Sequence, residues 1–517
     1  MKKNIILSTL VAALFSFGSC TDWLLEEQPG VTKLDDFYTS ADAAIQNVTA
    51  CYVPLQWEYN RTYFPEWFIG DVVSDDALKG GQDANDMGVV FDMENWKVEA
   101  NNTYLLDYYQ AQYQGIGRCN LALTYIPQME QDTALTASLQ GRLIGEAKFL
   151  RAYYYFRLLR VFGSVPYVDF IVESESDWAQ PATPVADLYG HIIKDLEDAQ
   201  KVLWKKSEYA DKDLGRVTKG AAEAMLLKVN LYNKNYAVAK AWGDSIIQSG
   251  EYDLCPVYAD NFTLAGENGI ESVFEIQYVE DPTSDYGQGN GFTRGTFTAI
   301  LTRSRSSQLG GGWGFNRPSK NLYSEFESGD PRRDVTILNP PAHMIENPAT
   351  EIYYGTPYLS RKYGMYNDDF SYVRLAHPTR GPLNNKQIRY ADVYLMYAEA
   401  CLGANDAPTA TIYLNKVRER VDLPIYPGYT FTVNGSTISN PTLEQAIRHE
   451  RRMELAMEGH RWFDLCRWGI AKETMDAYKQ TIDNEELKGH MAEFIRGKHE
   501  LFPIPSEELL LNPEQRQ

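Results

Sequence analysis

Hydrophobic residues recur at three- and four-residue spacing along most of the chain, the period of helices that bury one face. The clearest stripe runs through residues 142–162 and ends at Gly163 and Pro166, residues that stop a helix. Similar patterns predict further helices over residues 40–59, 103–128, 185–204, 219–232, 236–249, 390–402 and 409–421. The chain is therefore predicted to be mostly α.

Some of these helices are predicted to pack in pairs. Residues 219–232 and 236–249 flank a three-residue turn, and the run LYNKNYAVAKAW resembles the turn and second helix of a tetratricopeptide repeat. Residues 390–402 and 409–421 predict a second pair. The pairs do not keep the repeat's period of about 34 residues. We therefore expect a right-handed helical scaffold with long insertions.

Residues 251–383 depart from the helical pattern. They are rich in glycine and proline, and only a strand within 270–278 and a short helix capped by Ser319 are predicted. Residues 61–101 are also predicted to be irregular. A loop region this long on a helical scaffold is usually disordered or functional, and its aromatic residues favour a packed, functional region.

The stretch RHERRMELAMEGHRWFDLCRWG, residues 448–469, predicts a core-facing helix with charges on its buried stripe. Glu450 and Glu454 share that stripe with hydrophobic residues. Buried carboxylates persist only when they are paired, so we expect a buried Arg–Glu network. The local candidates for the partners are Arg448, Arg451, Arg452 and Arg461.

Two catalytic interpretations compete with structural pairing in this stretch. His449-Glu450 begins the zinc-protease motif H-E-x-x-H, but Met453 stands where the second His belongs. Glu450 and Glu454 could instead be the acid–base pair of a surface glycosidase. Burial discriminates between the hypotheses, because catalytic carboxylates must face a cleft and structural ones face arginine in the core.

Composition narrows the possible partners. The 517 residues carry a net charge of −21, which argues against binding to nucleic acid or to an anionic membrane surface. The 35 tyrosines combine a flat apolar face with a hydroxyl, which suits surfaces that bind sugars or peptides. The cysteines form no C-x-x-C pair, so neither a zinc site nor a redox motif is indicated and no cofactor is expected.

The N-terminus carries a predicted export signal. Two lysines precede an apolar run over residues 5–17 that is too short to span a bilayer. Gly18-Ser19-Cys20 is typical of a lipoprotein cleavage site, so residues 1–19 are predicted to be a signal peptide and Cys20 the lipidated first residue. Stable anchoring needs more than one acyl chain. Residues 20–39 are then an acidic tether.

The motifs of the chain resemble, in order, those of the RagB/SusD family of outer-membrane nutrient-binding lipoproteins. Besides residues 448–469, the matching runs are EAKFLRAYYYFRLLRVFGSVPYV, GWGFNRPSKNLYSEFESGDPRRD, IRYADVYLMYAEA, LNKVRER and LFPIPSEELLLNP. The resemblance implies a SusD-like helical scaffold over residues 40–250 and 384–517, with residues 251–383 as a ligand-binding excursion. We expect residues 40–517 to form one compact domain.

The resemblance also implies a function. The protein would capture an oligosaccharide or polysaccharide at the cell surface and deliver it to a SusC-type TonB-dependent transporter, which it covers as a hinged lid. It would be anchored in the outer membrane by lipid alone, and the acidic run after Cys20 resembles a signal for surface export. The family signature at residues 448–469 is structural, so no enzymatic activity is expected. Three alternatives stay open: a peptide-binding member of the family, the surface glycosidase, and a helical-repeat adaptor that binds only protein.

A neutral glycan requires exposed aromatic platforms with polar groups beside them. Trp313 lies in GGGWG, where flanking glycines leave the indole uncrowded. Trp96 lies just before a predicted helix, and the family resemblance implies that glycan sites form on loops from these two regions. The alternative is that either Trp packs its loop onto the scaffold. The candidate contacts are Trp96, Asn101, Asn102, Tyr286, Arg303 and Trp313.

Overall fold

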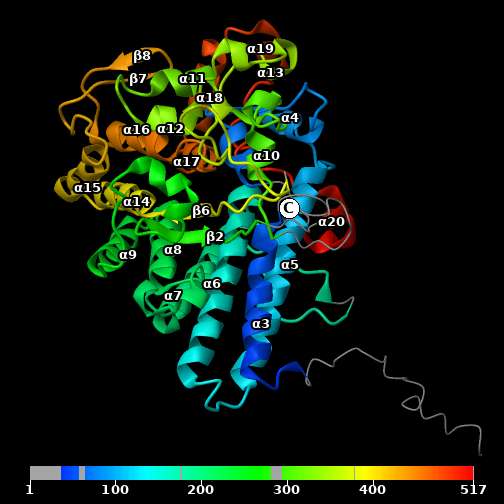
Figure 1. Ribbon diagram of the computed structural model, residues 1–517. Coiled ribbons are helices and arrows are strands. Elements are labelled where there is room, and N and C mark those ends of the chain that lie inside the picture. Colours follow the sequence, from blue (N-terminus) through cyan, green and yellow to red (C-terminus); the bar gives the residue numbers. More distant parts are fainter. Residues whose placement is uncertain (1–36, 58–64, 175–176, 281–293, 378, 516–517) are drawn as a thin grey trace, which may run out of the picture.

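The computed structural model describes residues 37–57, 65–174, 177–280, 294–377 and 379–515 (Figure 1). The predicted signal peptide, the lipidation site Cys20, most of the predicted tether and Tyr286 lie outside these residues. The described chain is mostly helical, as the hydrophobic pattern predicts, and Figure 1 shows long helices in its lower half and shorter ones above.

The helices are α3 (Ala41–Tyr52), α4 (Gly88–Glu94), α5 (Thr103–Tyr125), α6 (Ala137–Phe162), α7 (Val185–Val202), α8 (Lys219–Tyr232), α9 (Tyr236–Gln248), α10 (Thr298–Thr302), α11 (Lys320–Glu325), α12 (Arg332–Thr336), α13 (Pro348–Glu351), α14 (Tyr390–Gly403), α15 (Ala407–Glu419), α16 (Leu443–Leu455), α17 (Arg461–Trp468), α18 (Ala471–Thr481), α19 (Glu485–His490) and α20 (Ser506–Leu511). The strands are β1 (Ala77–Gly80), β2 (Ser272–Ile276), β3 (Phe315–Pro318), β4 (Ile337–Leu338), β5 (Leu359–Ser360), β6 (Asn385–Arg389), β7 (Phe431–Val433) and β8 (Ser436–Ile438).

The helical scaffold is a succession of neighbouring helices, in which α6, α7, α8, α9, α14 and α15 pack one after another. The predicted pairs α8–α9 and α14–α15 are therefore both present. Glycine brings α9 and α14 together, because a Cβ at Gly243 would lie 2.2 Å from the ring of Tyr397 and one at Gly403 would lie 2.4 Å from that of Tyr236.

Side-chain caps fix where several of these helices begin. Ser40, Asn102, Thr136 and Thr218 each accept the backbone N–H of the residue three positions later. Such caps satisfy donors that a helix leaves unpaired and contribute about 1 kcal/mol each. At the other end, Gly163 closes α6 with φ = 76°, which agrees with the stop predicted there.

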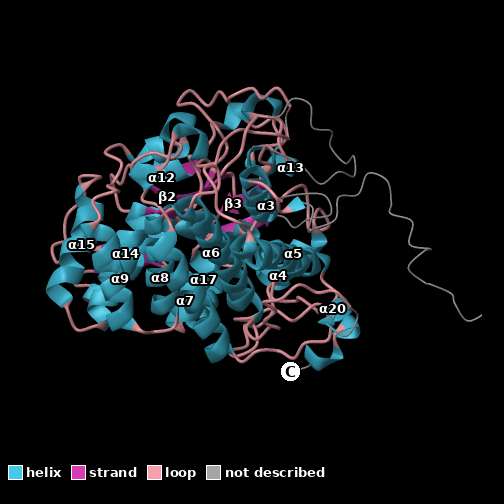
Figure 2. Cartoon of the chain, turned by 90° about the horizontal axis from the view of Figure 1, so that it is seen from below, coloured by secondary structure: helices cyan, strands magenta, loops and turns pink. Residues whose placement is uncertain are grey.

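The regions predicted to be irregular contain more regular structure than the sequence indicates. Residues 61–101 include β1 and α4, and residues 251–383 include α10, α12 and α13 besides the helix capped by Ser319, which is α11. These elements are too short to give a periodic signal. Two antiparallel pairings, β1 with β3 and β2 with β6, connect the loop-rich segment to both helical parts, and Figure 2 shows strands near the middle of the molecule.

The stretch 448–469 differs from the single helix that its pattern predicts. It forms α16 and α17, separated by a turn in which Met457 and Gly459 have φ values of 64° and 79°. The backbone of Gly459 packs directly against Gly70, where a Cβ would lie 2.0 Å from the Gly459 carbonyl oxygen. This close approach connects the turn to the N-terminal part of the chain.

Glu450 and Glu454 are fully buried and paired with arginine, as expected. Their partners, however, come from distant elements: Arg332 and Arg418 for Glu450, and Arg332, Arg389 and Arg420 for Glu454. The Arg389–Glu454 and Arg418–Glu450 contacts measure 2.9 and 2.6 Å. The arginines lower the pKa of Glu454 well below its usual range despite its burial.

The prediction that nearby arginines pair with these two glutamates is wrong. Arg451 pairs with Asp392 and Asp464, Arg452 and Arg461 pair with Asp75 and Asp76, and Arg448 pairs with exposed Glu444. The reason is geometric, since successive residues of a helix are rotated by about 100°. Arg451 and Arg452 therefore face other neighbours than Glu450 does.

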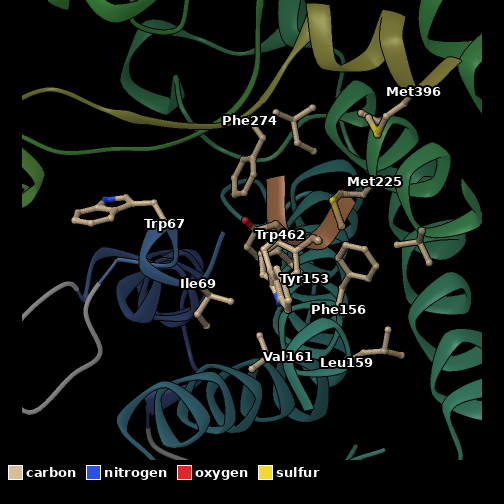
Figure 3. Close-up of a cluster of buried hydrophobic side chains, with 14 of the residues drawn as sticks. Trp67, Ile69, Tyr153, Phe156, Leu159, Val161, Met225, Phe274, Met396 and Trp462 are labelled. Carbon is tan, nitrogen blue, oxygen red and sulfur yellow. The ribbon is translucent and has the colours of Figure 1, made fainter. Parts of the chain in front are cut away.

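One hydrophobic core joins the parts of the chain. It includes Ile69 from a short π-helix at Phe68–Val72, Tyr153 from α6, Met225 from α8 and Trp462 from α17 (Figure 3). The cysteines among the described residues are all free, and Cys119 and Cys401 are buried within their helices, as expected.

Asp71 is a buried carboxyl that has no cationic hydrogen-bond partner among the residues that the structure describes. It accepts hydrogen bonds from Gly459 N (2.8 Å) and Asn316 Nδ2 (3.1 Å), and burial raises its pKa to about 8, with further repulsion from Asp76. A carboxyl whose pKa is raised on folding stabilises the fold below its unfolded pKa, and this stability is lost as pH rises through 8.

We expect Asp71→Asn to remove this dependence. The melting temperature of the natural protein should fall more steeply between pH 5 and 8 than that of the variant. The difference corresponds to at most about 1.4 kcal/mol per pH unit. Melting curves at each pH measure it, with Asp187→Asn on the exposed side of α7 as the control. Parallel curves for Asp71→Asn and the natural protein would show that Asp71 is ionised throughout.

Candidate functional site

Two loops meet where β1 and β3 pair. Residues 81–87 follow β1 and residues 310–314 precede β3, and the Gly81 N–H donates to the Gly314 carbonyl over 2.9 Å. The strand pairing thus holds side by side two segments that are more than 200 residues apart in sequence. We call four side chains on these loops and beside them the Trp313 cluster: Gln82, Asp86, Arg305 and Trp313.

Trp313 is the aromatic member of the cluster. Its ring is half-buried and lies 6.2 Å from that of Phe297. The backbone N–H of Trp313 donates to the Ile300 carbonyl over 2.8 Å. Gly314 has φ = 72°, a conformation that favours glycine. The backbone is therefore fixed on both sides of Trp313 while part of the indole stays accessible.

Arg305 connects Trp313 to the loop at residues 81–87, which contains Asp83 and Asp86 and is called the acidic loop below. Its Nη1 donates to the Trp313 carbonyl (3.2 Å) and lies 3.6 Å from Asp86, while Nη2 donates to Gln82 over 3.5 Å. The side chains of Arg305 and Asp86 are 29% and 33% exposed. An aromatic face beside accessible donors and acceptors is the arrangement that a sugar ring requires, because a sugar offers a flat C–H face and hydroxyls.

Lys79 holds the acidic loop in place through hydrogen bonds to its backbone. Its Nζ donates to the carbonyls of Asp83 and Asp86 and lies between 5.3 and 5.8 Å from the centres of three aromatic rings. Burial lowers the pKa of Lys79 to about 8. Sequence reasoning missed this residue, since a lone lysine ahead of two glycines gives no signal of its role.

Trp96 does not provide a second platform. It is only 7% exposed, its ring packs edge-on against Phe494, and its backbone has φ = 53°. It fastens the loop between α4 and α5 to the core, so the alternative of packing on the scaffold holds for this residue. The prediction that Trp96 is an exposed aromatic platform is therefore wrong.

Two other candidates are also buried. Arg303 donates from Nε to the Gly364 carbonyl (2.6 Å) and from Nη2 to the Val373 carbonyl (3.1 Å), so it braces loops. Asn102 caps α5 and donates to the Val89 carbonyl over 2.8 Å. Neither presents its polar groups to a ligand. Asn101 is exposed beside Asn102, and Tyr286 lies outside the described residues.

The carboxylates of the glycosidase hypothesis face no cleft. Glu450 and Glu454 are fully buried between arginines, which leaves them no contact with a substrate. His449 is buried as well and stacks on Phe431 with 3.9 Å between ring centres. Within the described residues, no group of three or more His, Cys, Asp or Glu side chains could hold a metal ion. Nor does any described helix have the length and apolar character needed to cross a membrane.

Comparisons with known proteins point to one family. A model of the SusD family matches residues 270–517, and a family model described as starch-binding and associating with the outer membrane matches residues 23–231. A SusD-like protein of Bacteroides ovatus is 27% identical over 90% of this chain and 83% of its own length.

Solved structures agree with these matches over almost the whole chain. A laminarin-binding SusD-like protein superposes with a TM-score of 0.76 and 28% identity, covering 92% of this chain and 98% of its own. Surface glycan-binding protein A from Bacteroides thetaiotaomicron, in complex with laminarihexaose, gives a TM-score of 0.74 and 26% identity over 90% of this chain and 97% of its own.

Proposed function

The chain belongs to the SusD/RagB family, and on that premise we propose that it binds a glycan nutrient at the Trp313 cluster and passes it to a transporter. The observation that carries the proposal is the partly accessible Trp313 ring, held by glycines and strands beside Arg305, Asp86 and Gln82. Asn101 is a further candidate contact, and so is Tyr286.

The substrate class that we propose is a β-glucan of the laminarin type. Support comes from two relatives of this fold, one named as laminarin-binding and one in complex with laminarihexaose. The alternative glycan is starch, because one family model is described as starch-binding. Calorimetric titration with laminarihexaose, and with a malto-oligosaccharide of equal length, separates the two. If neither binds, the peptide-binding alternative gains support.

We infer that the protein acts by binding and not by catalysis. The reason is the burial of Glu450 and Glu454, together with the names of the relatives, which describe binding proteins. The transporter that receives the glycan is proposed to be a SusC-type TonB-dependent barrel. The protein would close over it as a hinged lid, with bound glycan shifting the population toward the closed state.

A membrane experiment tests the anchor and the partner together. Cys20 is proposed to carry the lipid that holds the protein at the outer surface of the outer membrane. Cys20→Ala should therefore leave the protein in the soluble periplasmic fraction, since the acidic surface has no affinity of its own for an anionic bilayer.

The natural protein, extracted in mild detergent, should co-purify with a partner of barrel size. A membrane-bound Cys20→Ala variant would refute the anchor, and repeated recovery of the natural protein alone would refute the partnership.

A further inference from the structure

A groove of about 540 Å³ is lined by residues of α5 and by the C-terminal residues of the described chain. Figure 1 shows α5 and α20 on the side of the molecule away from the helix pairs. Its floor is the middle of α5. One wall consists of residues 166–172 with Asp177 and Trp178, and the other of α20 with Asn512 and Gln515. Gln110 on α5 donates to Glu508 on α20 over 2.8 Å, and Tyr109 exchanges hydrogen bonds with Gln515, so the C-terminal wall is fixed to the floor.

The lining of the groove is mainly apolar. Ile116, Leu121 and Ile171 contribute aliphatic surface, and large side chains on the rim are unusually accessible. The exposed fractions are 37% for Phe170, 45% for Val172, 56% for Trp178 and 65% for Leu511. Exposed apolar surface gathered around a hollow usually marks a binding site. The aliphatic lining favours an apolar side chain over a sugar.

One buried polar atom in the groove also needs a partner. Asn512 is 8% exposed, and its Nδ2 donates to the Gln180 carbonyl over 2.7 Å. Its Oδ1 is buried and, within the described residues, accepts no hydrogen bond. A buried acceptor left unpaired costs free energy, so an occupant that brings an N–H would be favoured.

The chain itself contains a segment that offers both apolar side chains and backbone N–H groups. Between Cys20 and Phe37 the sequence is polar and acidic except for a few residues, and Trp23-Leu24-Leu25 forms its one run of three large apolar side chains. The described chain begins at Phe37, and the next residue, Tyr38, stacks on Tyr125 with 4.5 Å between ring centres. Tyr125 is the last residue of α5, the helix that forms the groove floor.

Lengths permit the contact. From Ile116 to Tyr125 the helix rises about 14 Å, whereas the residues between Leu25 and Phe37 extend to about 40 Å. A short covalent connection of this kind gives an effective concentration in the millimolar range. We propose that Trp23, Leu24 and Leu25 dock in this groove, with an N–H of the segment donating to Asn512 Oδ1.

Docking would set the height of the protein above the membrane, a consequence that rests on the proposed lipid at Cys20. Undocked, the residues from Cys20 to Phe37 would let the body move as far as about 55 Å from the lipid. Docked, only the residues between Cys20 and Trp23 remain, so the groove side would face the membrane closely. The docking itself requires neither lipid nor glycan.

Amide hydrogen exchange read by mass spectrometry tests the proposal on the mature chain from residue 20 with Cys20→Ala. Peptides covering residues 21–36 should exchange at least tenfold more slowly than an unstructured chain. Gly117→Phe should abolish this protection, because Gly117 lines the groove and a Cβ there meets nothing within 4 Å. Leu24→Ser should weaken it by removing an apolar contact.

Gly190→Phe is the matched control. Gly190 also lies on an exposed helical surface, on α7, where a Cβ meets nothing within 4 Å, and it does not line the groove. It should leave protection unchanged, with melting curves showing that all variants fold. Exchange of residues 21–36 at the unstructured rate, or protection that survives Gly117→Phe, would overturn the proposal. So would protection lost on dilution, which would assign the groove to a second copy. Because the assay contains no glycan or membrane, its outcome is separate from that of the glycan titration.

Discussion

Replacing Arg332 by methionine is expected to lower the free energy of unfolding by about 3–5 kcal/mol, the cost of breaking a buried ion pair from one side. Arg332 has no exposed surface and donates to Asp330 (2.8 Å), Glu450 and Glu454 (3.1 Å). Methionine replaces the aliphatic stem but not the charge. Three buried carboxylates would lose a shared cation, and urea unfolding measures the loss.

The neighbouring residue provides the control. Arg333 is one-third exposed and pairs with Asp334 over 3.0 Å, so Arg333→Met should cost less than about 1 kcal/mol. Adding Glu450→Gln to Arg332→Met should recover part of the loss, because it removes one of the carboxylates that Arg332 helps to balance and so reduces the excess of buried negative charge. Equal unfolding midpoints for the Arg332 and Arg333 variants would show that the network does not stabilise the fold as the ion pairs indicate.

Trp313→Ala is expected to weaken binding of the cognate oligosaccharide by about 2 kcal/mol or more, roughly 30-fold. The indole is the aromatic surface of the Trp313 cluster, and its removal leaves the sugar ring without a face to stack on. Since the ring is only half-buried, the melting temperature should change little. Titration calorimetry with laminarihexaose and a melting curve on the same sample measure both quantities.

Variants of two other tryptophans are the controls for Trp313→Ala. Trp178→Ala removes a more exposed indole from the apolar groove and should leave glycan affinity unchanged. Trp96→Ala opens a cavity in the core and should lower stability by about 3–5 kcal/mol, so any loss of binding would accompany a loss of folding. Unchanged affinity in Trp313→Ala would remove the cluster from the binding site.

The long helices could be predicted from the sequence because each has its own periodic stripe. The helix predicted over 219–232 has those bounds in the structure, and that predicted over 236–249 ends one residue earlier. Of the short elements, the sequence predicts only β2 and the helix capped by Ser319, α11. The other short helices give no periodic signal. Most of the other short strands depend on hydrogen bonds to partners far away in sequence. β1 illustrates this, because its partner strand β3 begins at Phe315.

The candidate ligand site can be predicted from the sequence only in part. Trp313 has flanking glycines that give a local reason for exposure, whereas Trp96 is surrounded by polar residues and is nevertheless buried. Its burial depends on Phe494, which no local pattern connects to it. The same limit applies to Glu450 and Glu454. The pattern of their own helix predicts that both are buried and paired with arginine, but which arginines pair with them depends on the whole fold.

The pairing of Arg452 with Asp75 and Asp76 affects the order in which the polypeptide can assemble. These two aspartates lie in the N-terminal part of the chain, yet the cations that balance them lie on α16 and α17, which are synthesised much later. Because burying an unpaired charge is costly, we expect the aspartates to stay solvated, and the segment around β1 open, until those helices are made. Contacts between such distant residues slow folding because a long loop must close first. A truncated chain that lacks the C-terminal helices would therefore leave β1 and its loop unformed, however complete its own helices are.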